Sequence, residues 1–259
     1  MLLVVLMILT FAPDLADMGC KCQNRTTSRH GSCARRTASV SVSGRFSTPE
    51  ISQRLREPAA FDYGPEQRID QMIAFIEAMG LGPLDIVGNS MGGRTALATA
   101  IRRPDLVGDL ILMGSAGLDR SMGGALAALT EYDFTYRGME RIVIALTNDG
   151  HVPDPAMVQY RLELSCQPGQ RSAFGATMKA LQLRHGLWIE DEEIATVKHR
   201  TLIINGKHDK IIPIAHAYKY LELLENSTGV ILPHCWHWAM IEHPEIFSNT
   251  VLQFLNGQV

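Results

Sequence analysis

The sequence has few cysteines, almost no net charge and no apolar run long enough to cross a membrane. Five cysteines form an odd set among 259 residues, and Cys166 and Cys235 stand alone in the larger part of the chain, so we expect no disulfide framework. A formal net charge of −3 gives no general attraction to phosphate backbones or anionic lipids. These absences argue against a secreted disulfide scaffold, a nucleic-acid binder and a membrane protein. They favour a cytoplasmic protein with a small-molecule partner.

The N-terminal segment, residues 1–60, differs in composition from the rest of the chain. Residues 1–11 are almost wholly apolar, but they are too few for a bilayer span, and no Lys or Arg precedes them as in a signal peptide. Residues 21–60 carry eight Lys and Arg against two Glu, with many Ser and Thr, which is typical of solvated or disordered chain. We expect an atypical leader here, either disordered or produced by a frameshift or a misassigned start.

The leader also contains one candidate metal site. Cys20, Cys22, His30 and Cys33 could be drawn as zinc ligands, but they lack a paired C-x-x-C spacing and their flanks carry no fold signal. We therefore expect no bound metal.

From residue 61 onward, strand and helix patterns alternate. A helix is predicted at 65–79, bracketed by Pro65 and Gly80, followed by a strand at 84–87 and a helix at 92–101 that ends before Pro104. Further strands are predicted at 110–113, 201–204 and 230–232, and further helices at 214–224 and 244–255. This alternation indicates an α/β protein whose mostly parallel sheet is covered by helices on both faces.

The middle of the chain lacks this alternation. Between residues 117 and 197 the strand patterns disappear, and the sequence becomes helical and polar with scattered Gly, Pro and aromatic residues. We interpret this stretch as an inserted helical cap. The core of the domain is then made of residues 61–116 and 198–259.

A nucleophile motif lies between the first predicted strand of the core and the helix that follows it. The sequence Gly-Asn-Ser-Met-Gly at 88–92 fits G-x-S-x-G, in which glycines permit a strained turn that lifts the serine hydroxyl above the sheet edge. The pattern alone is common, but its position between strand and helix favours Ser90 as a nucleophile. The adjacent helix N-terminus favours negative charge at the same place.

A serine nucleophile needs a base and an acid that orients the base, in the chain order Ser, Asp, His for this architecture. Asp209 follows the predicted strand 201–204, and His237 follows the predicted strand 230–232. Each residue alone reads as an ordinary loop side chain, and three other histidines compete for the role of base. Their joint order and placement favour Asp209 and His237 over the competitors His208, His234 and His243.

Three segments resemble the meta-cleavage product hydrolases of the α/β-hydrolase fold, the carbon–carbon bond hydrolases of aromatic-ring catabolism, with the carbazole and biphenyl branch closest. They are residues 89–93, the loop 206–213 and, above all, the run Cys-Trp-His-Trp-Ala-Met-Ile-Glu-His-Pro at 235–244. The similarity spans residues 61–259. It implies a Ser90, Asp209 and His237 triad, no metal or organic cofactor, and a dimer or higher homo-oligomer. It also implies that Asn89 and Trp238 line the pocket.

The same resemblance assigns a substrate-binding role to Arg161 in the cap. A 2-hydroxy-6-oxo-dienoate is an anion, and a guanidinium can hold its carboxylate and adjacent oxygen in a planar fork. The family's reaction implies enol-to-keto tautomerisation, then Ser- and His-assisted addition at the C6 ketone and cleavage of the C5–C6 bond. The alternative for Arg161 is a surface residue paired with Glu163 or another acid. Leu146 is a candidate wall residue of the cap.

Two features depart from the family. Trp236 stands where family members usually have glycine, immediately before the catalytic histidine, and its bulk could disturb the pocket or the histidine. The family's buried strand and His-Gly-rich loop, which supply the second oxyanion amide, have only a weak counterpart in His-Gly-Ser at 30–32, because no apolar strand is expected before it. The Met91 amide is the safer oxyanion donor, and Ser32 is a weaker candidate.

Three hypotheses follow from these residues. The first is a serine-dependent C–C bond hydrolase acting on meta-cleavage products. The second is an esterase, because the same triad cleaves esters and the cap selects the substrate. The third is an inactive, hydrolase-like binding module caused by the aberrant N-terminus. The group on C6 of the substrate cannot be deduced from the sequence.

Overall fold

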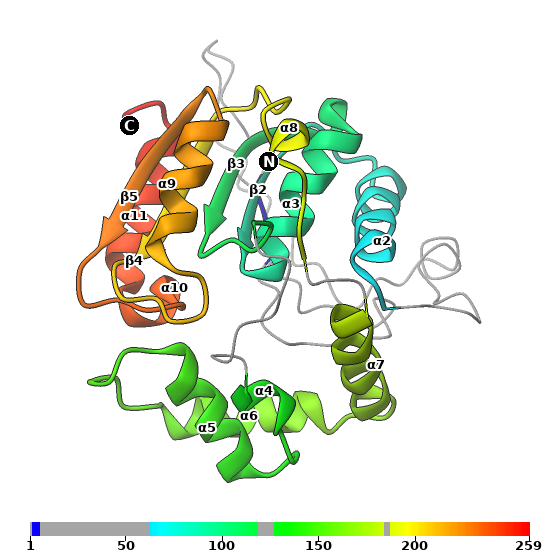
Figure 1. The fold of residues 1–259 in the computed structure, drawn as a ribbon, viewed down its shortest axis with the longest axis vertical. Coiled ribbons are helices and arrows are strands. Elements are labelled where there is room, and N and C mark those ends of the chain that lie inside the picture. Colours follow the sequence, from blue (N-terminus) through cyan, green and yellow to red (C-terminus); the bar gives the residue numbers. More distant parts are fainter. Residues whose placement is uncertain (1, 6–62, 119–126, 184–186) are drawn as a thin grey trace, which may run out of the picture.

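The computed structural model describes residues 2–5, 63–118, 127–183 and 187–259 as an α/β fold (Figure 1). The strands are β1 (Leu2–Val5), β2 (Leu84–Asn89), β3 (Val107–Met113), β4 (Thr201–Gly206) and β5 (Ser227–Leu232). The helices are α2 (Pro65–Ala78), α3 (Met91–Arg102), the short 3-10 helix η2 (Pro104–Leu106), α4 (Ala127–Thr130), α5 (Tyr136–Leu146), α6 (Pro155–Ser165), α7 (Gln170–Leu183), α8 (Asp191–Ile194), α9 (Ile214–Leu223), α10 (Ala239–Glu242) and α11 (Pro244–Leu255). The five strands form one parallel sheet in the order β1-β2-β3-β4-β5, which confirms the predicted fold class.

The leader contributes an edge strand to this sheet, which corrects the expectation that no strand precedes His30. Residues 2–5 pair in parallel with β2, in a register that sets Leu2 opposite Asp85 and Val5 opposite Gly88. The apolar run at the start of the chain is therefore used, in part, for strand pairing. The rest of the leader lies outside the described residues, together with its zinc candidates and Ser32.

The sheet is buried on both faces because its strands alternate between two clusters of apolar side chains. Leu110 and Leu112 of β3 face one cluster, which also contains apolar residues of α2, α3 and α9. Ile111 and Met113, the intervening residues, face the other cluster with apolar residues of α11. Successive side chains of a strand point to opposite faces of the sheet. Because both faces are buried here, most positions of a core strand are apolar, and the strands appear in the sequence as continuous apolar runs.

The helices α4, α5 and α6 form a separate group beyond one end of the sheet, with α10 on the core side facing them (Figure 1). Their apolar side chains share a cluster of buried residues with α7 and with one residue of the core, Trp238. We call it the cap cluster, and its members are Leu129, Tyr132, Met139, Ile142, Val143, Leu146, Val158, Ala173, Phe174, Met178, Leu181 and Trp238. Ile189, Ile194 and Val197, which lie within the predicted cap 117–197, pack in the core cluster that contains α3.

The local signals for helix ends agree with the structure. Pro65 is the first residue of α2, and Gly80 follows its end with a φ of +60°, a conformation that glycine adopts without strain.

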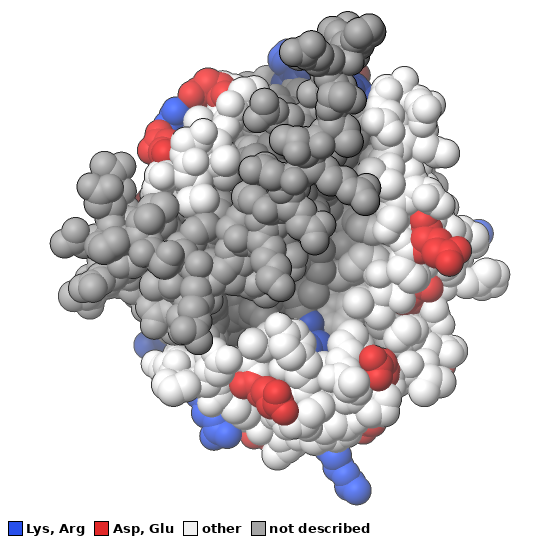
Figure 2. All heavy atoms as spheres, turned by 180° about the vertical axis from the view of Figure 1, so that it is seen from behind, with Lys and Arg blue, Asp and Glu red and all other residues white. Residues whose placement is uncertain are grey.

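None of the helices in the described part of the chain is long and apolar enough to span a membrane. On the face shown in Figure 2, the described acidic and basic side chains are scattered, in keeping with the small net charge.

Candidate active site

The register of the sheet brings the ends of its central strands to one edge. Asn89 at the end of β2 lies opposite Met113 of β3, Met113 lies opposite Ile204 of β4, and Gly206 lies opposite Leu232 of β5. The segments that follow these strands therefore start at the same edge. They contain Ser90, the loop 207–213 and the loop 233–238, which we call the histidine loop. The three predicted triad residues are thus collected at one place by strand pairing.

Ser90 occupies a strained turn between β2 and α3. Its φ and ψ are 55° and −121°, which a non-glycine residue rarely adopts and which is typical of a nucleophile at the tip of a strand-to-helix turn. Its amide donates to the Met113 carbonyl (3.1 Å), and its carbonyl accepts from the amides of Arg94 and Ala116. The turn needs glycine at position 88, because a Cβ there would lie 2.6 Å from the Gly92 carbonyl oxygen.

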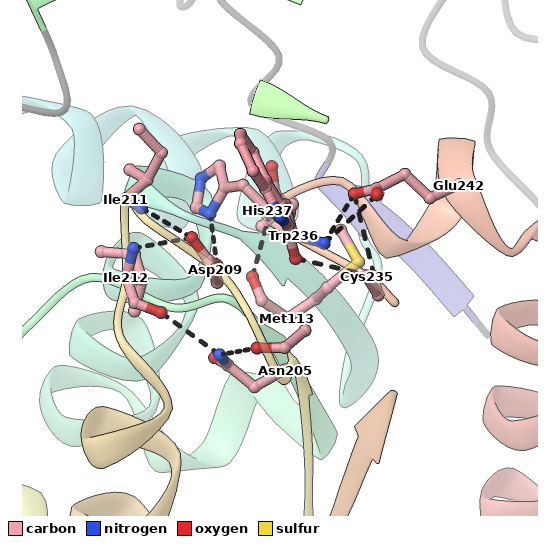
Figure 3. Close-up of polar contacts among 11 residues, drawn as sticks. Met113, Asn205, Asp209, Ile211, Ile212, Cys235, Trp236, His237 and Glu242 are labelled. Carbon is pink, nitrogen blue, oxygen red and sulfur yellow. Dashed lines mark hydrogen bonds and ion pairs between the residues drawn. The ribbon is translucent and has the colours of Figure 1, made fainter. Parts of the chain in front are cut away.

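Asp209 and His237 form a buried pair (Figure 3). His237 Nδ1 lies 2.8 Å from Asp209 Oδ2, and the two side chains are 2% and 0% exposed. The other oxygen, Oδ1, accepts hydrogen bonds from the amides of Ile211 (2.8 Å) and Ile212 (2.9 Å), which fix the carboxylate. An oriented carboxylate on Nδ1 sets the imidazole tautomer that leaves Nε2 free to accept a proton.

The competing histidines do not share this arrangement. His208 and His234 are exposed, and His243 uses Nε2 toward the carbonyl oxygen of His234 (3.3 Å). None of the three contacts Asp209 through a hydrogen bond in the described part of the chain. His237 is therefore the histidine with the geometry of a general base.

The contact between Ser90 and His237 is open in the described structure. Ser90 Oγ forms no hydrogen bond to any described residue, and His237 uses only Nδ1. Hydrogen bonds between a nucleophile and its base are often long until substrate binds. Both atoms that would exchange the proton are thus unengaged at the same edge of the sheet.

Asn89 uses its side chain differently from the predicted pocket-lining role. It is 1% exposed, and its Nδ2 donates to the carbonyl oxygens of Met113 (3.0 Å) and His237 (3.4 Å). The amide therefore ties the histidine loop to the end of β3. No sequence pattern could have revealed this, because both acceptors are main-chain atoms far along the chain.

Trp236 does not displace the histidine, although glycine is usual in the family at this position. Its ring is 8% exposed and lies under Lys210, whose Nζ is 3.5 Å from the ring centroid, while His237 keeps its bond to Asp209. The close backbone approach occurs at Gly206 instead. A Cβ at Gly206 would overlap the carbonyl oxygens of Cys235 and Trp236.

Gly206→Ala is expected to lower the free energy of unfolding by about 3 kcal/mol, because the added methyl forces the rigid backbone of the histidine loop away from β4. The expected drop in Tm is about 6–12 °C, measured by thermal unfolding. Gly175→Ala is the matched control, since Gly175 is exposed in α7 and a Cβ there meets nothing within 4 Å. Equal melting temperatures for the two variants would contradict this account of the close approach.

Arg161 is a buried cation without an acidic partner in the described part of the chain. It is 7% exposed, its Cζ lies 4.6 Å from the centroid of the Trp238 ring, and its buried Nε has no hydrogen-bond acceptor. Burial lowers the pKa of Arg161 to about 10, and nearby Tyr132 offsets this in part. This burial contradicts the surface alternative, and Glu163 accepts a hydrogen bond from Gln159 (2.8 Å). An anionic ligand would supply the missing partner.

The remaining predicted residues lie where the cap meets the sheet edge. Met91 is the first residue of α3, its amide has no acceptor among the described residues, and its side chain packs against the cap cluster. Such an amide beside Ser90 suits an oxyanion. Trp238 and Leu146 are buried in the cap cluster, at 3% and 4% exposed.

The structure also reveals cap residues that the sequence did not indicate. A pocket in the cap is lined by Tyr132, Phe134, Met139, Ile142, Ser165, Gln170 and Phe174. The hydroxyl groups of Tyr132 and Ser165 lie 2.6 Å apart, and the buried Oε1 of Gln170 has no hydrogen-bond partner in the described part of the chain. Aromatic residues at irregular spacing carry no signal for such a pocket.

The cysteines and acids of the described chain suggest no other catalytic centre. Burial raises the pKa of the Cys235 thiol, with Glu242 as a further cause, so this thiol is a poor nucleophile. Within the described ranges no group of three His, Cys, Asp or Glu residues could hold a metal ion. Ser90, Asp209 and His237 therefore remain the candidate catalytic residues at this edge of the sheet.

Comparisons with known proteins point to one enzyme family. Residues 9–250 match the model of the alpha/beta hydrolase family, so the match extends into the leader. The chain is 45% identical over 196 residues to 2-hydroxy-6-oxo-6-(2'-aminophenyl)hexa-2,4-dienoic acid hydrolase of Metapseudomonas resinovorans, covering 75% of this chain and 68% of that protein. It is 32% identical over 200 residues to 2-hydroxymuconate semialdehyde hydrolase of Pseudomonas sp. strain CF600, covering 76% of this chain and 71% of that protein.

A solved structure gives the same result. The crystal structure of a serine hydrolase involved in carbazole degradation, the CarC enzyme, superposes with a TM-score of 0.70 at 44% identity, covering 77% of this chain and 74% of that chain. The strained serine, the buried His–Asp pair and these similarities together identify the chain as an enzyme of the alpha/beta hydrolase family, and within that family as one of the meta-cleavage product hydrolases.

Proposed function

We propose that this protein hydrolyses the C5–C6 bond of a 2-hydroxy-6-oxo-hexa-2,4-dienoate, with Ser90 as nucleophile, His237 as general base and Asp209 as the acid that orients it. The observation that carries the substrate class is Arg161, a buried cation with no acidic partner among the described residues. A dienoate carboxylate would offset the cost of burying this charge. The names of the related hydrolases support the same class.

The proposed reaction uses side chains, one main-chain amide and water. Arg161 holds the carboxylate and the C2 oxygen while a proton moves from the enol hydroxyl to C5, which converts C2 to a ketone. Ser90 Oγ then adds to the C6 carbonyl as His237 takes its proton, and the Met91 amide binds the oxyanion. The C5–C6 bond breaks, its electron pair is delocalised onto the C2 oxygen, and His237 returns the proton. Water hydrolyses the acyl group on Ser90 in a second step.

The cap, predicted at 117–197, is proposed to select the C6 group. Of the relatives named above, the hydrolase that is 45% identical acts, by its name, on a dienoate with a 2'-aminophenyl group on C6. We therefore propose an aryl group on C6, and a series of dienoates with aryl and alkyl C6 groups tests it through the ratio of their kcat/KM values.

Arg161→Leu is expected to lower kcat/KM for a dienoate by about 100-fold or more, because a charge-assisted fork to the carboxylate is lost. Hydrolysis of a small neutral ester should change by less than about threefold, since the triad is untouched. The exposed cap residue Arg137, changed to Leu, is the matched control. An equal loss on both substrates would show that Arg161 supports the site as a whole and does not recognise the carboxylate.

Two further properties are part of the proposal. We place the protein in the cytoplasm as a homo-oligomer of two or more copies. The free thiols of Cys166 and Cys235 support a reducing compartment, and the resemblance to the family supports an oligomer. Light scattering of the purified full-length chain measures the oligomeric state.

A further inference from the structure

The carboxylate of Glu242 lies where the cap meets the histidine loop, and the reaction proposed above does not use it. Glu242 is the last residue of α10 and is half-buried. No Lys or Arg in the described part of the chain forms an ion pair with it. A carboxylate removed from water without a cation is costly unless hydrogen-bond donors surround it.

Those donors come from two directions. From the histidine loop, the Trp236 amide donates to Oε1 (3.0 Å) and Oε2 (3.2 Å), and the Cys235 thiol approaches Oε1 (3.8 Å), as Figure 3 shows. From the cap, the main-chain amide of Asn148 (2.9 Å) and its Nδ2 (2.7 Å) both donate to Oε2. Hydrogen bonds to a charged acceptor are the stronger kind.

The same cap segment has a second connection to the core. Asn148 Nδ2 also donates to the His234 carbonyl oxygen (3.0 Å). Asp149 Oδ1 lies 3.6 Å from Lys210 Nζ, which in turn lies over the Trp236 ring. Residue 149 thus contacts Lys210, the chain neighbour of Asp209, and residue 148 contacts His234, three residues before His237.

We propose that Glu242 is a positioning residue that couples the cap to the catalytic histidine. Asn148 lies just beyond the end of α5, and α5 packs against α6, the helix that carries Arg161. Glu242 therefore helps to fix the separation between Arg161 and His237. This role rests on the proposed function, because a dienoate must be held by Arg161 at one end and attacked at the other, and small misplacements of reacting groups are costly.

The test is a double-mutant cycle of Glu242→Gln and Asn148→Ala. In Glu242→Gln an amide N–H₂ faces the donors of Trp236 or Asn148, and in Asn148→Ala the cap loses its side-chain donor. Each single variant is expected to lower the dienoate-to-ester ratio of kcat/KM about tenfold. The double variant should lose clearly less than the product of the two single losses, because both changes remove the shared contact between Asn148 Nδ2 and Glu242 Oε2. Glu245→Gln, an exposed change in the first turn of α11, is the control.

Two results would overturn the proposal. One is a dienoate-to-ester ratio of kcat/KM that is about 100-fold lower in the double variant than in the parent, which would mean that the two residues act independently. The other is an unchanged dienoate-to-ester ratio in the single variants. If the parent enzyme hydrolyses esters but no dienoate, the proposed function fails, and melting temperatures then decide on the contact itself. A shift of the melting temperature in the double variant that is clearly smaller than the sum of the two single shifts supports the coupling, and a shift equal to their sum overturns it.

Discussion

Replacing Ser90 by alanine is expected to lower dienoate turnover by about 1,000-fold or more while the protein stays folded. The loss is large because no other described side chain at the sheet edge can form the acyl intermediate, so only binding and the oxyanion site would remain. The fold should survive because the Ser90 side chain makes no capping hydrogen bond at the start of α3. The measurement is the loss of visible absorbance of the dienoate under single-turnover conditions.

The matched control for this variant is Ser248→Ala on the exposed side of α11. It should bleach the dienoate at the parental rate, and both variants should melt within a few degrees of the parent protein. Equal, slow bleaching by the parent and by Ser90→Ala would show that the serine takes no part in the reaction.

Asp209→Asn is expected to lower kcat by about 10,000-fold on dienoates and esters alike. Asparagine keeps an oxygen for the amides of Ile211 and Ile212, so the loop should hold its shape. Its N–H₂ group, however, would face His237 Nδ1 and stabilise the tautomer that carries the proton on Nε2. That imidazole cannot accept the proton of Ser90.

Both substrates need the base, so Asp209→Asn should lower the rate of dienoate and ester hydrolysis alike. Arg161→Leu should lower only the rate on the anionic dienoate. Steady-state rates of each variant on the two substrates separate the roles. Asp105→Asn, an exposed change in η2, is the control. A kcat within tenfold of the parent for Asp209→Asn would contradict the assigned role of the carboxylate.

The sequence was sufficient to predict the core from residue 61 onward because its signals are local. Pro65, Gly80 and Pro104 mark helix ends, and apolar runs between them mark buried strands. The strand at residues 2–5 was missed for a physical reason. Four apolar residues become a strand only by pairing with β2, more than 80 residues away, and no local pattern encodes that pairing.

The same distinction between local patterns and distant contacts applies to the candidate site. Asp209 and His237 could be found because each follows a recognisable strand, and parallel strands end at a common edge. The tertiary contacts could not be found. The bond from Asn89 to the His237 carbonyl spans 148 positions of the chain, and the bond from Asn148 to Glu242 spans 94. Such contacts depend on the packed position of the cap.

Trp236 illustrates the limit of judging one residue by its size. Its bulk suggested a disturbed histidine, yet its ring packs beneath Lys210 and its amide is held by Glu242. Gly206 leaves room for the main-chain carbonyl groups of Cys235 and Trp236, so the backbone before His237 can lie close to β4.

Product analysis of this protein with a 6-aryl dienoate decides whether it cleaves the C5–C6 bond. We expect that the dienoate colour is lost and that one equivalent of the aryl carboxylic acid appears with one equivalent of 2-hydroxypenta-2,4-dienoate, both identified by mass. If the protein hydrolyses a neutral ester but leaves the dienoate intact, its substrate class has been misassigned; if it does neither, the buried His237–Asp209 pair does not serve catalysis.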